Sequence, residues 1–200
     1  MELLQILTAR PPRERADAVR NREKVLTAAA RLFREKGVDN VSMDAIAAEA
    51  GVGKGTLFRR FGDKSGLAVA LLDDAERALQ EAILSGPPPL GPGAPAPDRM
   101  AAFAAAYADY LFGHLDLVRM SESASPGARY RVGAYHFWHR HLVILLEEAR
   151  PDADAGYLAH AVLALLGAEL AAALHPDYGE DRLKAGVLAV VSALCGPRGA

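Results

Sequence analysis

The chain has 200 residues, of which 51% are hydrophobic, and this length can bury a substantial core as one or two domains. A single cysteine, Cys195, excludes an intrachain disulfide framework and favours a reducing cytoplasm. The apolar start, Met1 to Leu7, is too short for a secretion signal and lacks the cationic beginning of one.

The formal net charge of −2 hides an uneven distribution along the chain. Residues 10–64 hold thirteen Lys or Arg and eight Asp or Glu, a local charge of +5, whereas residues 65–200 hold ten basic and sixteen acidic residues, a local charge of −6. A cationic segment attracts phosphates and an acidic one does not.

We expect a basic N-terminal arm over residues 1–20, followed by three short helices. The first helix carries an apolar stripe at helical spacing and ends at Gly37. Ser42 is placed to cap the second helix, because its hydroxyl can accept one of the free amide protons at a helix start. Asp44 in the first turn suits the positive end of that helix.

A Gly51-Val52-Gly53 turn separates the second helix from a third, Lys54 to Phe61. Glycine can adopt the left-handed backbone of a tight reversal, and Val52 is expected to enter the core. Leu57 and Phe61, four residues apart, would hold the third helix on the other two. Its outward face is basic and fits the major groove of B-DNA, where base edges are readable.

The segment from Gly51 to Lys64, GVGKGTLFRRFGDK, strongly resembles the signature of the TetR family of bacterial transcriptional regulators. The resemblance covers about the first quarter to third of the chain. It implies base contacts from Lys54, Gly55 and Thr56. It also implies phosphate contacts from Ser42, Phe58, Arg60 and Lys64, with Arg59 close to either bases or phosphates.

Two positions depart from the family's common pattern. Phe58 stands where Tyr is common, and a phenyl ring cannot donate a hydrogen bond to a phosphate. Gly53 stands where Ser or Thr is common, so the third helix lacks a side-chain cap.

The remainder, residues 67–200, is also predicted to be helical. We expect a fourth helix from Asp63 to Leu84 and a loop from Gly86 to Pro97, where six prolines and three glycines in twelve positions prevent helix or sheet. Asp98 would cap a helix to about His114, and another would run from about Gly127 to Arg150. No stretch alternates like a strand.

The predicted fold is therefore all-α. It comprises an N-terminal three-helix helix-turn-helix DNA-binding domain over residues 21–66 and a C-terminal helical bundle for effector binding and dimerisation over residues 67–200.

Aromatic residues and histidines are concentrated between Phe103 and Leu146. Helix bundles build ligand cavities from facing side chains, so one hypothesis is a pocket for a small-molecule effector. Its predicted lining is Phe103, Tyr107, Tyr110, Leu111, His114, Met120, Tyr135, Trp138, His139 and Leu142. Ordinary core packing is the alternative for each of these residues. His136, His139 and His141 lack the spacing and partners of a tetrahedral metal site, so we expect neither a metal nor a cofactor.

Two apolar helices, about Ala153 to Leu174 and Tyr178 to Cys195, close the chain. Because a helix that is apolar on two sides must bury both, we expect a homodimer through residues 153–195, as the resemblance also implies. A membrane span over Tyr157 to Leu174 is the weaker interpretation, since a charge at the bilayer centre costs about 2.5 to 3.5 kcal/mol. We therefore expect no membrane interaction and a cytoplasmic location.

The functional prediction is a ligand-responsive transcriptional regulator, most simply a repressor that a small molecule of unknown identity releases from a palindromic double-stranded DNA operator. A DNA-binding protein without an effector is one alternative, and a helical enzyme is another. The glycines around Lys54 resemble a phosphate loop only superficially, because Gly55 separates Lys54 from Thr56 and no strand precedes them. No catalytic residue is predicted.

Overall fold

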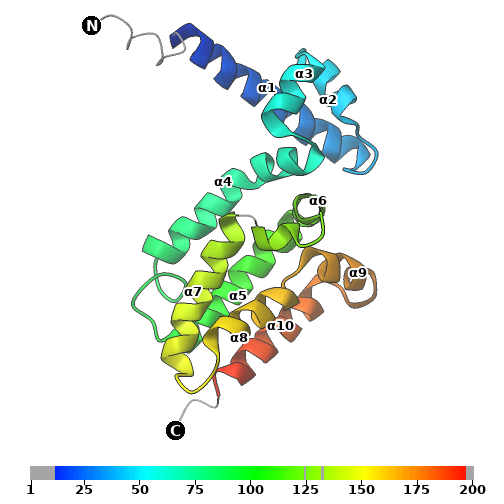
Figure 1. The fold of residues 1–200 in the computed structure, drawn as a ribbon. Helices are drawn as coiled ribbons and strands as arrows, with labels where there is room; N and C mark the ends of the chain where they lie inside the picture. The colour runs from blue at the N-terminus through cyan, green and yellow to red at the C-terminus, as the bar shows by residue number, and fades with distance from the viewer. Residues whose placement is uncertain (1–11, 124, 132, 197–200) are drawn as a thin grey trace, which may run out of the picture. The chain divides into compact units, whose positions relative to one another are not determined.

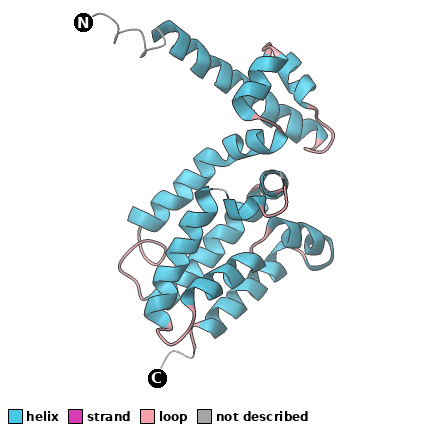
Figure 2. Cartoon of the chain, viewed as in Figure 1, coloured by secondary structure: helices cyan, strands magenta, loops and turns pink. Residues whose placement is uncertain are grey.

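A computed structural model describes residues 12–123, 125–131 and 133–196. The described residues form α-helices and one 3-10 helix, without a β-strand (Figures 1 and 2), which confirms the all-α prediction. The chain divides into two compact units between Ala70 and Leu71, a point inside helix α4. The boundary expected after residue 66 also lies inside this helix.

The N-terminal unit contains three helices and the start of a fourth. They are α1 (Pro12–Lys36), α2 (Met43–Ala50), α3 (Lys54–Phe61) and α4 (Lys64–Ser85). Apolar side chains from all four are buried together, among them Ala29, Ile46, Leu57 and Leu67, each at most 1% exposed.

Helix α1 begins earlier than the sequence pattern suggests. Residues 12–20 are helical and continue directly into the apolar part of α1, so they are not a separate arm. Pro12 is the first helical residue, a position where the missing amide proton costs nothing. The first part of the expected arm, residues 1–11, lies outside the described residues.

The turn between α2 and α3 follows the local sequence rules. The Ser42 hydroxyl accepts a hydrogen bond from the Ala45 amide at 3.1 Å, as expected for the cap of α2. Gly51 has φ +64° and ψ +35° and donates to the Ala47 and Ala48 carbonyls, which closes α2 in the left-handed conformation. Val52 is half-buried below this turn.

The C-terminal unit is a helical bundle built on the rest of α4. Its further elements are α5 (Ala96–Gly113), α6 (Leu115–Glu122), the 3-10 helix η1 (Ala128–Arg131), α7 (Gly133–Ala149), α8 (Ala155–Leu165), α9 (Ala168–Tyr178) and α10 (Glu180–Leu194). Helix α7 packs on α5 and α8, α10 packs on α5, and α6 packs on α9. Phe103, Met100, Trp138 and Leu142 are among the largest side chains of this core.

Two predicted helix boundaries in this unit are wrong. Helix α5 starts at Ala96, so Asp98 lies in its first turn and is not its cap. The helix expected from Gly127 is instead η1 followed by α7, which starts at Gly133.

The helix expected over Ala153–Leu174 is two helices, α8 and α9, with a bend of 45° between them. Apolar residues continue across the break at Gly167, so the periodicity gave no sign of it. No single described helix is both long and apolar enough to cross a membrane, and only the bent pair of α8 and α9 taken together reaches that length and composition.

Candidate DNA-binding site

Helix α3 presents most of its surface outward. Within α3, which is described throughout, Leu57 is the one fully buried side chain, at 1% exposure, and Phe61 is half-buried. The six remaining residues are exposed: Lys54, Gly55, Thr56, Phe58, Arg59 and Arg60. Two apolar anchors thus hold the helix and leave a cationic face available to a polyanion.

The Lys54 ammonium pairs with the Asp44 carboxylate of α2. Lys54 stands at the positive end of α3, where a cation is unfavourable, and Asp44 offsets that charge. Both side chains are more than half exposed, and exposed ion pairs contribute only about 0 to 1 kcal/mol. Lys54 can therefore leave Asp44 for another acceptor at little cost.

Lys64 has a structural role that the sequence did not suggest. Its ammonium donates to the Val38 carbonyl at 2.6 Å and to the Val41 carbonyl at 2.9 Å. These contacts tie the start of α4 to the connection between α1 and α2. A lysine has three N–H donors, so one remains for a phosphate.

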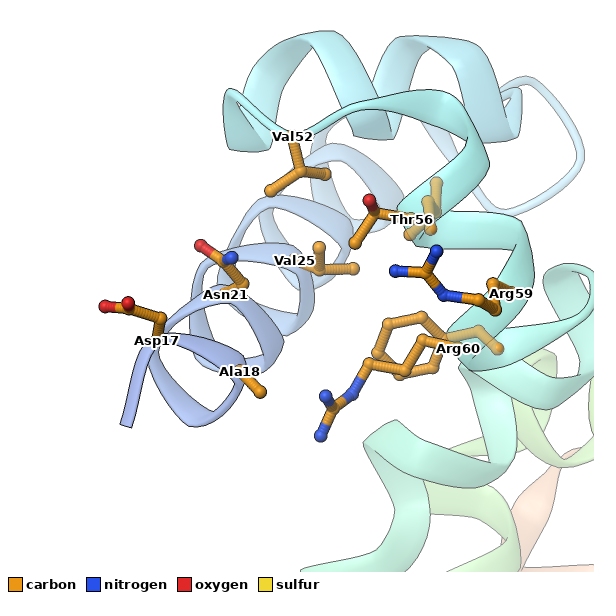
Figure 3. Close-up of a pocket in the computed structure, with 10 residues that line it drawn as sticks. Asp17, Ala18, Asn21, Val25, Val52, Thr56, Arg59 and Arg60 are labelled. Atoms are coloured by element: carbon orange, nitrogen blue, oxygen red, sulfur yellow. The ribbon is translucent and has the colours of Figure 1, made fainter. Parts of the chain in front are cut away.

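A groove of about 600 Å³ lies between α1 and α3 (Figure 3). Thr56, Arg59 and Arg60 line it from α3, and Asn21 lines it from α1. Three of the eight residues expected to contact DNA therefore border one concave surface. Ser42, Lys54, Gly55, Phe58 and Lys64 do not line it.

The ten residues expected to line an effector pocket fall into several groups in the C-terminal unit, two of which are in contact, because the Tyr107 and Tyr110 rings are 5.6 Å apart. Phe103, Tyr107 and Trp138 form one aromatic cluster with ring centroids 5.7 to 6.2 Å apart, and each is at most 4% exposed. Leu111 and Leu142 are buried in the same core. This geometry is that of packed core side chains.

A second group joins α7 to α8. The Tyr135 hydroxyl lies 2.7 Å from His160 Nδ1, and the His139 and His160 rings are 4.0 Å apart between centroids. His139 Nε2 lies 3.0 Å from the Gly156 carbonyl oxygen. Desolvation, and then the charge of His139, lowers the pKa of His160. The described residues contain no group of three or more His, Cys, Asp or Glu that could hold a metal ion.

A third group joins α4 to α5. The Tyr110 hydroxyl donates to Glu76 Oε1 at 3.0 Å, and the Tyr110 and His114 rings are 5.6 Å apart. Burial raises the pKa of Glu76, although the hydrogen bond from Tyr110 opposes this effect. Met120, the last of the ten, is half-buried on α6.

The sequence reasoning missed a buried ion pair between Glu122 and Arg129. Arg129 Nη1 lies 3.2 Å from Glu122 Oε1, and the side chains of Arg129 and Glu122 are only 12% and 15% exposed. Arg129 Nη2 also donates to the carbonyls of Leu163 and Leu166, at 2.7 and 3.2 Å. Glu122 Oε2 accepts from the Ala168 amide at 3.3 Å.

This ion pair fixes the break between α8 and α9. The cation meets the negative C-terminal end of α8 and the anion meets the positive N-terminal end of α9, so both helix ends are satisfied. Burial raises the pKa of Glu122, and the nearby Arg129 charge opposes that rise. No sequence signal connects these residues, because Arg129 lies 34 to 37 positions from the carbonyls that it binds.

Comparison with known proteins agrees with the N-terminal geometry. Residues 25–71 match the family described as bacterial regulatory proteins, tetR family. An HTH-type transcriptional regulator of Staphylococcus aureus (strain bovine RF122 / ET3-1) is 53% identical over 53 residues, which are 26% of this chain and 29% of that protein. A second one, from S. aureus strain USA300, matches to the same extent. The chain thus matches less than a third of the length of these relatives.

Solved structures resemble the fold over most of its length. A TetR-family transcriptional regulator from Streptomyces coelicolor has a TM-score of 0.62 at 23% identity, over 88% of this chain and 95% of that one. A second, from Pectobacterium atrosepticum, has a TM-score of 0.62 at 22% identity, over 90% and 94%. At these identities the likeness concerns the fold. The match over residues 25–71 shows a helix-turn-helix DNA-binding segment of the TetR family at the N-terminal end, and the fold of the described chain is like that of TetR-family transcriptional regulators.

Proposed function

We propose that the chain is a ligand-responsive repressor that binds a palindromic DNA operator as a homodimer and is released by a small molecule. The single observation that carries this proposal is the face of α3, which is anchored by Leu57 and otherwise exposed and cationic. A helix with such a face can enter the major groove, about 12 Å wide, and contact base edges.

In this proposal the start of α3 reads bases. Lys54 and Thr56 would donate to base edges, and Gly55 would let the backbone approach the duplex closely. A Cβ at Gly55 would meet no described atom within 4 Å, so this side of the helix is open. Ser42, Phe58, Arg60 and the remaining N–H of Lys64 would contact the phosphate backbone, and Arg59 would lie near either.

Exposed apolar surface on the last helices supports a homodimer. Tyr157 on α8 is 71% exposed, and Val190 on α10 is 42% exposed. Small residues accompany them on the exposed faces of α8 and α10: Ala161, Ala164, Ala185, Gly186, Ala189 and Ala193. Small side chains allow helices of two subunits to approach closely. A two-fold axis would then present two α3 helices to successive major grooves, with centres about 34 to 36 Å apart.

The effector would bind the C-terminal unit, near the aromatic groups around Tyr107, Tyr110 and Tyr135. Binding that favours a different conformation opposes DNA binding by a coupling of about 1 to 3 kcal/mol. A cavity of about 580 Å³ in this unit, beside Glu122 and Arg129, is large enough for a small molecule but is lined by none of the ten predicted pocket residues.

The proposal is tested by selecting bound fragments from random double-stranded DNA and measuring affinity for the selected sequence by fluorescence anisotropy. We expect a palindromic site, a dimer in sedimentation, and a steep dependence on salt. Arg60→Ala should flatten the salt dependence by about one unit, because one phosphate contact is lost. Arg140→Ala removes an equal charge from an exposed position on α7 and should leave the slope unchanged.

Two outcomes would contradict the proposal. Purified protein that prefers no duplex at moderate salt, or that sediments only as single subunits, would overturn the DNA-binding dimer. A selected operator whose affinity responds to no small molecule in a broad screen would instead favour a regulator without an effector.

A further inference from the structure

The groove between α1 and α3 is a feature that the recognition helix alone does not explain. Residues 17–25 of α1 form one wall and α3 forms the other, as Figure 3 shows. The full lining is Asp17, Ala18, Asn21, Val25, Val52, Thr56, Leu57, Arg59, Arg60 and Phe61. The groove lies wholly within the N-terminal unit.

The two walls differ in charge. On α3, Arg59 and Arg60 are exposed at the edge of the groove and bring two cations to it. On α1, Asn21 brings a neutral carboxamide and Asp17 a single anion, which pairs with Arg20 on its own helix. The groove therefore combines two cations and hydrogen-bond donors, which suits an anionic ligand.

The dimensions of DNA point to a particular anionic ligand. An α-helix with its side chains is about 10 to 12 Å wide and fills a major groove about 12 Å wide. A sugar-phosphate strand must then pass along each flank of an inserted helix. Because the groove runs along one flank of α3, a strand on that side would enter the space between Arg60 and Asn21.

We propose that the first turns of α1 hold one DNA strand against α3. The Asn21 carboxamide would donate a hydrogen bond to the sugar-phosphate backbone of that strand, and the negative charge of Asp17 would weaken the binding. This inference rests on the proposed DNA-binding function and adds two residues of α1 that neither the motif nor the family match, which begins at residue 25, includes. Asp17 is an anion beside the expected path of a phosphate, so its charge should oppose binding.

Charge variants on the two sides of α1 test the proposal. Asp17→Asn should tighten binding to the selected operator roughly two- to fivefold at about 0.15 M salt, where charges farther than about 8 Å are largely screened. Glu23→Gln is the matched control, because this substitution removes the same charge from the same helix. Glu23 lines a different hollow, together with Thr27 and Arg31. The affinity of the Glu23→Gln variant for the operator should change by less than about twofold.

Removal of the proposed donor gives an independent test. Asn21→Ala should weaken binding roughly ten- to hundredfold, the range for one hydrogen bond to a charged group, and should abolish hydroxyl-radical protection of the sugars beside it. Thr27→Ala, on the other hollow of α1, should leave affinity and footprint unchanged. Thermal melts establish that all four variants are folded.

The outcomes separate this inference from the function on which it rests. If the parent protein binds no duplex, both are wrong. If the parent binds its operator, but Asp17→Asn behaves like Glu23→Gln and Asn21→Ala behaves like Thr27→Ala, only the strand-holding groove is refuted. A gain of affinity in Asp17→Asn together with a lost footprint in Asn21→Ala supports it.

Discussion

The buried histidine of α7 should make the stability of the C-terminal unit depend on pH. His141 is 8% exposed and packs on the Phe103 ring at 5.3 Å between centroids. Among the described residues, its Nε2 atom has no hydrogen-bond partner. Burial, and then the charge of Arg99, lowers the pKa of His141 from 6.5 to about 4.

The direction of the effect follows from proton binding in the two states. Between pH 6.5 and 4 the imidazole is protonated in the unfolded chain but not in the folded chain. The free energy of unfolding is therefore highest at neutral pH and decreases as the pH is lowered through this range. Each pKa unit is worth about 1.36 kcal/mol. The contribution lost is therefore about 2 kcal/mol at pH 5 and approaches about 3 kcal/mol at pH 4.

The prediction is measured by urea unfolding at pH 7.5 and pH 5, followed by circular dichroism at one fixed protein concentration. His141→Leu replaces the imidazole with an apolar side chain of similar size. The variant should lose about 2 kcal/mol less than the parent between the two pH values. His175→Asn, an exposed position on α9, is the control and should lose as much as the parent.

Carboxylates also titrate near pH 5, so the comparison between variants decides the matter. Equal losses in the parent and in His141→Leu would show that the buried imidazole is charged in both states, or that water solvates it in the folded protein. Either explanation would refute the assignment of His141 as a neutral core residue.

Three further predictions concern single contacts. Lys64→Ala should lower the free energy of unfolding by roughly 1.5 to 3 kcal/mol in chemical denaturation, because the buried Val38 and Val41 carbonyls lose a charged donor. Arg129→Met should destabilise by roughly 3 kcal/mol, and adding Glu122→Leu should restore part of the loss, because an unpaired buried carboxylate is the main cost. Trp138, the sole tryptophan, is 2% exposed, so iodide should not quench its emission before unfolding, and an effector bound nearby should shift that emission.

The N-terminal unit could be predicted from its sequence because its determinants are local. Ser42 caps the helix that starts at the next residue, and Gly51 closes that helix in the one region where glycine is favoured. Leu57 and Phe61 follow helical spacing within α3. None of these features depends on a residue far away in the chain.

The C-terminal unit could be predicted only in outline, because distant residues decide its details. The break at Gly167 depends on Arg129 and Glu122, which reach α8 and α9 from another part of the chain. Apolar periodicity predicts which residues are buried but not where an apolar run bends. Lys64 is a similar case, since its contacts with Val38 and Val41 have no sequence signature.

The two units also differ in how closely function is tied to folding. The proposed DNA contacts are exposed residues on a helix that Leu57 and Phe61 hold in place, so changes at Arg59 or Arg60 should alter binding with little loss of stability. Tyr107 instead lies in the core, at 4% exposure, and its truncation would leave a cavity. A loss of effector response in such a variant therefore indicates an effector contact only if stability, measured in parallel, is unchanged.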